Sequence, residues 1–129
     1  MNELDGKTIL ITGATNGIGK AAAMLLAKKG AAIVIVGRNP AKTMQTVDEI
    51  KAQGGARLVD GLVADLSSMT EVRHLAAEFR QKHTRLDVLI NNAGGVFTNR
   101  ELTVDGYERT FAFNHLSYFL LTNLLIDQL

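Results

Sequence analysis

Cysteine is absent from the 129-residue sequence, which excludes disulfide frameworks and thiolate chemistry. Histidine is scarce, and His74, His83 and His115 are too scattered to form a metal-binding cluster. An excess of charge of either sign is also missing. The formal net charge of +1 provides no overall basic field that would attract nucleic acid or an acidic membrane. We therefore expect no metal centre and no nucleic-acid partner.

Long apolar segments are scarce as well. The N-terminal residues Met1–Lys7 are polar and lack the apolar run of a signal peptide, which favours a cytoplasmic location. The stretch Thr110–Ile126 has no formal charge, but it contains several polar residues, among them Asn114 and Asn123. It is also shorter than the ~20 apolar residues that a membrane span needs. We interpret it as a helix buried on most sides and expect no membrane span.

Hydrophobic residues make up 47% of the chain and charged residues 21%, the balance of a soluble globular protein. A chain of this length fits one domain, which we expect to span residues 1–129. Short apolar runs alternate with segments of helical periodicity, and this alternation predicts parallel strands joined by right-handed crossovers. Because the strands are apolar almost throughout, helices should cover both faces of a doubly wound α/β sheet. The predicted strands are Thr8–Thr12, Ala32–Val36, Leu58–Ala64 and Leu86–Asn91.

A helix is predicted after each strand. The first spans Gly17–Lys29, the second begins at Asn39-Pro40, and the third opens with a capping box from Ser68 to Glu71. After a polar loop, Asp105 should cap a last helix that runs to the C-terminus. The side chains expected to face the sheet are Ile18, Ala22, Leu25 and Leu26 in the first helix, Met44, Val47 and Ile50 in the second, and Val72, Leu75, Ala76 and Phe79 in the third.

A glycine-rich loop with the sequence TGATNGIG joins the first predicted strand to the first helix. In this position Gly13 permits a tight turn, Gly17 lets the backbone approach a pyrophosphate, and Gly19 lets helix and strand pack closely. The free N–H groups and the dipole of the helix start favour an anion. A tight turn without a ligand is the alternative interpretation of this loop taken alone.

The spacing G-x-x-x-G-x-G resembles the nucleotide-binding signature of the short-chain dehydrogenase/reductase family. Three further motifs follow in the family's order, namely Asp65-Leu66, the NNAG sequence at 91–94, and Asn114. The resemblance covers essentially the whole chain. It implies a Rossmann-type sheet with strand order 3-2-1-4, truncated relative to the seven strands of the full family fold and so incomplete at the C-terminus.

The resemblance also implies roles for individual residues. Asp65 and the backbone at Leu66 would contact the adenine ring, and Asn114 would help to hold a water molecule in the proton relay. The alternative for Asn114 is a helix asparagine that satisfies a local carbonyl group. The predicted cofactor-binding residues are Gly13, Ala14, Thr15, Asn16, Gly17, Ile18, Gly19, Arg38, Asn39, Asp65, Leu66, Asn92, Ala93 and Gly94, and the predicted catalytic residue is Asn114.

The end of the second predicted strand bears on the choice between NAD and NADP. Proteins that bind NAD usually place Asp or Glu there to hold the ribose 2′-OH. This chain has Gly37-Arg38-Asn39 and no carboxylate. The Arg38 guanidinium could pair with a 2′-phosphate through charge-assisted hydrogen bonds, although it could also be an ordinary surface arginine. We predict a preference for NADP(H), with NAD(H) as the weaker alternative.

The family's catalytic Tyr-x-x-x-Lys motif does not occur in these 129 residues. Tyr107 is followed four residues later by Phe111, and Tyr118 by Thr122. The family resemblance therefore implies an oxidoreductase acting on an alcohol or carbonyl compound, while this chain alone should be inactive. The sequence NHLSYFLLTNLL at 114–125 resembles the retinol-dehydrogenase-like branch and points to a hydrophobic substrate.

Two other functions stay open, a dinucleotide-binding module without turnover and a self-associating fragment. A short sheet would leave Leu86–Asn91 as an apolar edge, which invites pairing with another chain. The last helix carries most of the aromatic residues, and Asp127 is its only formal charge after Arg109. We therefore predict a homo-oligomer that forms through Phe111–Leu129.

Overall fold

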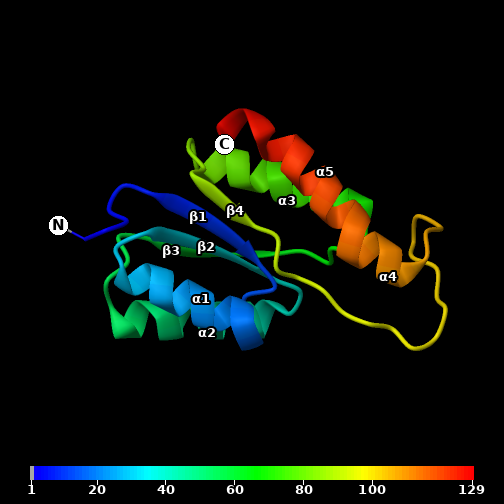
Figure 1. Ribbon diagram of the computed structural model, residues 1–129, viewed down its shortest axis with the longest axis horizontal. Helices are drawn as coiled ribbons and strands as arrows, with labels where there is room; N and C mark the ends of the chain where they lie inside the picture. The colour runs from blue at the N-terminus through cyan, green and yellow to red at the C-terminus, as the bar shows by residue number, and fades with distance from the viewer. Residues whose placement is uncertain (1) are drawn as a thin grey trace.

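The computed structural model describes residues 2–129 as a parallel four-stranded sheet with helices on both faces (Figure 1). The strand order is β3-β2-β1-β4, as the family resemblance implied. The strands are β1 (Thr8–Thr12), β2 (Ala32–Gly37), β3 (Val59–Val63) and β4 (Val88–Ile90). The helical segments are α1 (Gly17–Lys28), α2 (Pro40–Gln53), α3 (Met69–Lys82), α4 (Arg109–Phe111), the π-helical turn η1 (Ala112–Leu116), α5 (Ser117–Leu125) and the 3₁₀ turn η2 (Ile126–Gln128).

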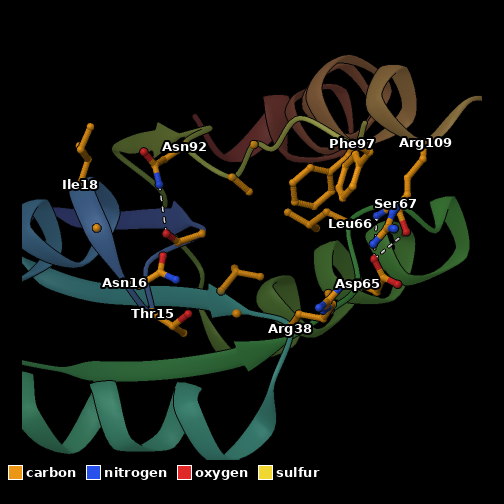
Figure 2. A pocket seen from close by; sticks show the side chains of 18 residues that line it. Thr15, Asn16, Ile18, Arg38, Asp65, Leu66, Ser67, Asn92, Phe97 and Arg109 are labelled. Atoms are coloured by element: carbon orange, nitrogen blue, oxygen red, sulfur yellow. Dashed lines mark hydrogen bonds between the residues drawn. The ribbon is translucent and has the colours of Figure 1, made fainter. Parts of the chain in front are cut away.

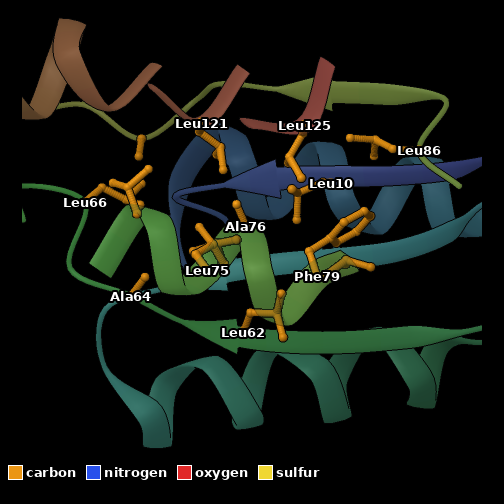
Figure 3. Close-up of a cluster of buried hydrophobic side chains, with 14 residues drawn as sticks. Leu10, Leu62, Ala64, Leu66, Leu75, Ala76, Phe79, Leu86, Leu121 and Leu125 are labelled. Atoms are coloured by element: carbon orange, nitrogen blue, oxygen red, sulfur yellow. The ribbon is translucent and has the colours of Figure 1, made fainter. Parts of the chain in front are cut away.

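Alternation along the strands divides the core into two clusters, one on each face of the sheet. Ile9, Ile11 and Ile33 point toward α1 and α2. Leu10 and Val34 point toward α3 and α5, where they join the cluster drawn in Figure 3. Phe79, Leu121 and Leu125 complete that cluster from the helices, and each is essentially inaccessible to solvent. The two-sided burial accounts for the nearly continuous apolar strands.

The predicted inner face of α1 is wrong in part: Leu26 packs against the core and Ala22 is half-buried, but the fully buried positions differ from those predicted. The buried residues are Gly19, Ala23 and Ala27, whereas Ile18 and Leu25 are exposed. A Cβ on Gly19 would collide with the carbonyl oxygen of Gly13 and with a side chain of the fourth-strand loop, so the helix lies too close to the strand ends for large residues. In α2, Met44 is likewise exposed, although the predicted Val47 and Ile50 are buried.

The fourth strand is shorter than predicted, because the chain leaves the sheet after Ile90. Beyond the strand, the backbone N–H groups of Asn92 and Ala93 donate to the Thr12 hydroxyl, each at 3.0 Å. β4 lies at one edge of the sheet, and Val88 is 42% exposed, so the expected apolar edge is present. The third strand also starts one residue later and ends one residue earlier than predicted.

The start of the last helical region also differs from the prediction. Glu108, not Asp105, caps α4, and its carboxylate accepts hydrogen bonds from the N–H groups of Thr110 and Phe111. Asp105 instead accepts from the N–H of Met69 at 2.9 Å and so caps α3. Within residues 2–129 no helix is both long enough and apolar enough to cross a membrane.

Candidate functional site

A pocket of about 370 Å³ opens at the carboxyl ends of the parallel strands (Figure 2). Loops that follow all four strands contribute to it, as expected for a binding crevice in an open α/β sheet. Its lining residues are Gly13, Thr15, Asn16, Gly17, Ile18, Val36, Gly37, Arg38, Ala64, Asp65, Leu66, Ser67, Asn92, Ala93, Gly94, Phe97, Arg109 and Phe113. Most of the predicted cofactor-binding residues are therefore brought together in one cavity.

Three predicted residues lie outside this lining, each for a different reason. Ala14 is fully buried behind the loop. Gly19 is buried in the contact between α1 and the strand ends. Asn39 uses its side chain to cap α2 by accepting from the N–H of Lys42 at 3.0 Å. These residues support the walls of the pocket and do not form its surface.

The glycine-rich loop shows two kinds of glycine. Gly13 has a φ of +65°, and a Cβ there would lie 2.7 Å from the Cα of Ala93. Gly17 has a φ of +56°, but in the described structure no atom lies within 4 Å of the position its Cβ would take. Gly13 is thus required by packing against the fourth-strand loop. The space in front of Gly17 is open, so a ligand could reach the backbone there.

The first turn of α1 faces the pocket without side-chain caps. Asn16 occupies the N-cap position, but within residues 2–129 its side chain makes no capping hydrogen bond, and the turn holds no acidic residue. The N–H groups at the start of a helix carry a partial positive charge, and here they are available to an anion. This geometry and the open space at Gly17 fit a pyrophosphate group.

Arg38 lies at the tip of β2, on the pocket rim. It is exposed, and within the described residues no carboxylate lies within ion-pair distance of it. Gly37 precedes it in a crowded position, because a Cβ there would collide with the side chains of Thr15 and Thr43. The backbone at the strand tip is therefore held in place while the guanidinium stays available to a ligand.

Asp65 follows β3 and is held from both sides. Its Oδ1 accepts from the backbone N–H of Ser67 at 3.0 Å and from the Ser67 hydroxyl at 2.7 Å. Its own N–H donates to Glu71 at 2.8 Å. The predicted capping box is therefore only half formed, since Ser68 caps the N–H of Glu71 while the Glu71 carboxylate reaches back to Asp65. These bonds fix Asp65 at the pocket wall.

Asn92 and Ala93 are tied to the glycine-rich loop. The Asn92 amide donates to the carbonyl oxygen of Gly13 at 3.1 Å, in addition to the bonds that both backbone N–H groups make with Thr12. Thr12 is a site residue that was not predicted from the sequence. A buried hydroxyl at the end of a strand is a weak signal, because threonine is common in strands for its shape alone.

Asn114 lies in the π-helical turn η1, and its side chain makes two hydrogen bonds to the backbone of Gly95. Its Oδ1 accepts from the Gly95 N–H at 2.9 Å, and its Nδ2 donates to the Gly95 carbonyl at 2.7 Å. The nearby Tyr118 hydroxyl donates to the carbonyl of Ala93, and burial raises the pKa of Tyr118 above its ordinary value of 10.0. Tyr118 therefore holds Ala93 within the NNAG segment, and Asn114 holds Gly95 directly after it.

An aromatic cluster at one end of the pocket was not predicted from the sequence either. The rings of Phe97 and Phe113 meet edge to face with their centroids 5.9 Å apart. The Arg109 guanidinium carbon lies 3.9 Å from the centroid of the Phe97 ring. No local pattern predicts this cluster, because Phe97 belongs to a loop and reaches the other two residues only in the folded chain.

Comparison with known proteins agrees with this geometry. A family model described as short chain dehydrogenase matches residues 7–129. Among curated proteins, the chain is 44% identical over 126 residues to a provisionally named daunorubicin C-13 ketoreductase of Streptomyces sp. (strain C5). It is 40% identical over 126 residues to retinol dehydrogenase 13 of Homo sapiens. Each match covers 98% of this chain but only 44% and 38% of the respective relatives, so the chain spans less than half of their length.

A solved structure shows the same similarity in three dimensions. A metagenomic short-chain oxidoreductase in complex with NADP superposes with a TM-score of 0.84 at 30% sequence identity. That match covers 97% of this chain and 56% of the solved one. The family model, the relatives and the parallel sheet lead to one conclusion: the chain belongs to the short-chain dehydrogenase family of oxidoreductases.

Proposed function

We propose that this chain is the dinucleotide-binding part of an NADP(H)-dependent oxidoreductase that interconverts an alcohol and a carbonyl compound. The observation that carries the proposal is the uncapped start of α1, which opens onto the same pocket as Arg38. NADP(H) carries phosphate at two matching places, the pyrophosphate and the 2′-phosphate. When bound, the cofactor would supply the hydride chemistry. Residues 1–129 would then act as one dinucleotide-binding domain.

Each part of the pocket lining binds a different part of the cofactor in this proposal. The backbone N–H groups between Gly13 and Gly19 bind the pyrophosphate, and the Arg38 guanidinium binds the 2′-phosphate through charge-assisted hydrogen bonds. Asp65 and the backbone of Leu66 contact the adenine ring. Asn92, Ala93 and Gly94 line the remaining wall. The NADP complex of the similar metagenomic oxidoreductase supports the choice of cofactor.

The described residues bind and orient the cofactor, but they are poorly placed to move a proton. The Tyr118 hydroxyl is engaged with the Ala93 carbonyl, and its raised pKa keeps it protonated. Both polar atoms of the Asn114 side chain are engaged with Gly95. We propose that residues 1–129 bind NADP(H) without turnover, and that proton transfer in the whole protein uses the Tyr-x-x-x-Lys pair of the family. The role of Asn114 in a proton relay stays a prediction.

A titration of both cofactors tests the proposal. We expect NADPH to bind more tightly than NADH, measured by the change in cofactor fluorescence. The variant Arg38→Asp should weaken NADPH binding by tenfold or more and strengthen NADH binding, since one lost charged hydrogen bond costs about 1.5–3 kcal/mol. The matched control is Arg57→Asp, which makes the same charge change at an exposed loop residue outside this pocket. Equal effects of the two variants would contradict the proposed role of Arg38.

Self-association is a second candidate function, and a specific surface favours it. Along the last helical region, Phe111, Phe119, Ile126 and Leu129 are exposed, with Phe119 at 64%. We propose that this surface, called here the α5 surface, joins two or more copies of the chain. Light scattering at micromolar concentration should then give a mass above that of the monomer. Phe119→Glu should lower that mass, while Leu25→Glu, at an exposed position on α1, should not.

Two finer predictions complete the proposal. The likeness to retinol dehydrogenase 13 supports a hydrophobic alcohol or carbonyl substrate for the whole protein. A panel of short and long aliphatic alcohols, assayed with the whole protein, tests this prediction through the change of KM with chain length. The cytoplasmic location also stays a prediction, and fractionation of cells that express the whole protein tests it.

A further inference from the structure

The two ends of the pocket differ in chemistry (Figure 2). One end holds the first turn of α1, with Asn16 and Ile18. The other end holds the aromatic cluster of Phe97, Phe113 and Arg109, and Figure 2 draws Leu66 and Asp65 on the same side of the pocket. The first end suits a phosphate group. The second end is lined by aromatic and apolar side chains together with the Asp65 carboxylate, and so suits a flat group that carries a hydrogen-bond donor.

Phe97 is held in its position from two sides. Phe113 packs against its ring edge to face, and the Arg109 guanidinium lies 3.9 Å from the ring centroid. Arg109 is itself fixed to Glu101, through a side-chain ion pair of 3.0 Å and a backbone hydrogen bond of 2.9 Å. The guanidinium therefore supports the Phe97 ring while its charge is paired with Glu101.

The segment that carries Phe97, residues 95–108, is anchored to the body of the protein at two points. At its start, the backbone of Gly95 is hydrogen-bonded to both polar atoms of the Asn114 side chain. Near its end, Asp105 accepts a hydrogen bond from the N–H of Met69 at the start of α3. These contacts place Phe97 on a fixed segment beside α3 and η1, so its ring is a built part of the pocket wall.

We propose that Phe97 contacts the adenine ring of the bound dinucleotide and closes the base-binding end of the pocket, with Arg109 as a positioning residue that holds the Phe97 ring. This inference rests on the proposed function, since it needs a dinucleotide in the pocket. A base has an apolar face that packs well on an aromatic ring. Its exocyclic amine can donate to Asp65, whose Oδ2 accepts no hydrogen bond from the described residues.

The test compares ligands that contain the base with one that lacks it, by calorimetric titration of the 129-residue chain. Phe97→Ala should weaken binding of NADPH, NADH and 2′,5′-ADP alike, each by about tenfold. Binding of inorganic pyrophosphate should stay unchanged in the same variant. Arg38→Asp, by contrast, should weaken NADPH and 2′,5′-ADP but not NADH. This difference separates contact with the base from contact with the 2′-phosphate.

Further variants distinguish loss of the contact with the base from a general disturbance of the structure. Phe97→Tyr keeps a ring and should bind 2′,5′-ADP like the wild type. Arg109→Met should weaken the binding of 2′,5′-ADP by a smaller factor than Phe97→Ala does, and it should leave the binding of pyrophosphate unchanged. Val96→Ala is the matched control, because Val96 lies on the same segment but is 87% exposed and outside the pocket.

The possible failures are distinguishable. If the wild type binds NADPH and 2′,5′-ADP but Phe97→Ala binds both equally well, the role of Phe97 is overturned while the proposed function stands. Equal weakening of pyrophosphate and 2′,5′-ADP would also overturn it, since the loss would then be structural. If the wild type binds none of the nucleotides, the proposed function fails, and the role of Phe97 fails with it.

Discussion

Helices α1 and α3 both begin at the carboxyl edge of the sheet, but their first turns differ. Ser68 caps the N–H of Glu71 in α3, and Asp105 caps the N–H of Met69. In α1, the Asn16 side chain caps none of the N–H groups within residues 2–129. A capped turn satisfies its donors internally and stabilises the fold, whereas an uncapped turn keeps its donors for another partner. The first turn of α3 therefore stabilises the fold, whereas the first turn of α1 keeps its N–H groups available to a ligand.

The loop before α1 allows the largest test of this comparison. Gly13→Ala should destabilise the protein by about 3 kcal/mol. The left-handed backbone of an alanine costs about 1–2 kcal/mol, and displacement of the Ala93 backbone adds to it. Gly17→Ala should cost only the backbone part, about 1–2 kcal/mol, because its Cβ would meet no atom of the described chain within 4 Å. Urea unfolding measures both values.

Gly17→Ala is the less destabilising of the two substitutions, but it should have a direct effect on ligand binding. Gly17→Ala should remain folded at 25 °C and yet lose most of its affinity for NADPH, because the new Cβ occupies the space in front of the helix start. The control is Gly6→Ala, which has a similar positive φ of +80° and open surroundings but lies far from the pocket. If Gly6→Ala and Gly17→Ala bind NADPH equally well, the uncapped turn does not bind the cofactor.

A smaller effect is expected from removing the N-cap side chains themselves. Ser68→Ala should destabilise the protein by about 1 kcal/mol, as is typical when a capping side chain is lost, and Asn39→Ala should do the same for α2. Asn16→Ala should change the free energy of unfolding by less than about 0.5 kcal/mol, because no capping bond is broken. Thermal unfolding of the three variants under one buffer condition makes the comparison. A loss at Asn16 equal to that at Ser68 would show that α1 is capped after all.

The same local patterns explain how much of the fold could be predicted from the sequence. Strand β1 was predicted at its observed bounds, because a run of β-branched residues buried on both faces has few alternatives. The inner face of α1 was predicted wrongly at Ile18 and Leu25, because hydrophobicity alone favours these two residues. Close approach of the helix to the sheet selects small residues instead, and Gly19 and Ala23 fill that contact.

The candidate site likewise contains residues that local sequence predicts and residues that only tertiary contacts bring into place. The glycine-rich loop is contiguous in sequence, so its spacing predicts its place in the pocket. Thr12 contacts Asn92 and Ala93, which lie 80 or more residues away along the chain. Phe97 likewise owes its position to Phe113 and Arg109. Contacts of this kind depend on the packed tertiary structure, and no local period or spacing in the sequence encodes them.

Glu108 provides the smallest and most specific test, through pH. Its carboxylate accepts from the N–H groups of Thr110 and Phe111, and these bonds hold the pKa of Glu108 below its ordinary value of 4.5. A carboxyl group with a lowered pKa stabilises the folded state fully above its unfolded pKa, and this contribution is lost as the pH falls through the folded pKa. Glu108→Gln should therefore have a lower Tm than the wild type at pH 7.

At pH 3 the difference between the two proteins should be smaller, because the wild-type carboxyl group is then taking up its proton. Asp48→Asn, at an exposed position on α2, is the control for a lost surface charge. A Tm difference that stays constant from pH 7 to pH 3 would contradict the capping role of Glu108. No carboxylate lies in the first turn of α1, so no acid-dependent cap should exist there. The stabilising charge at the start of α1 would instead come from the ligand, and NADPH should raise the Tm of the wild type more than that of Gly17→Ala.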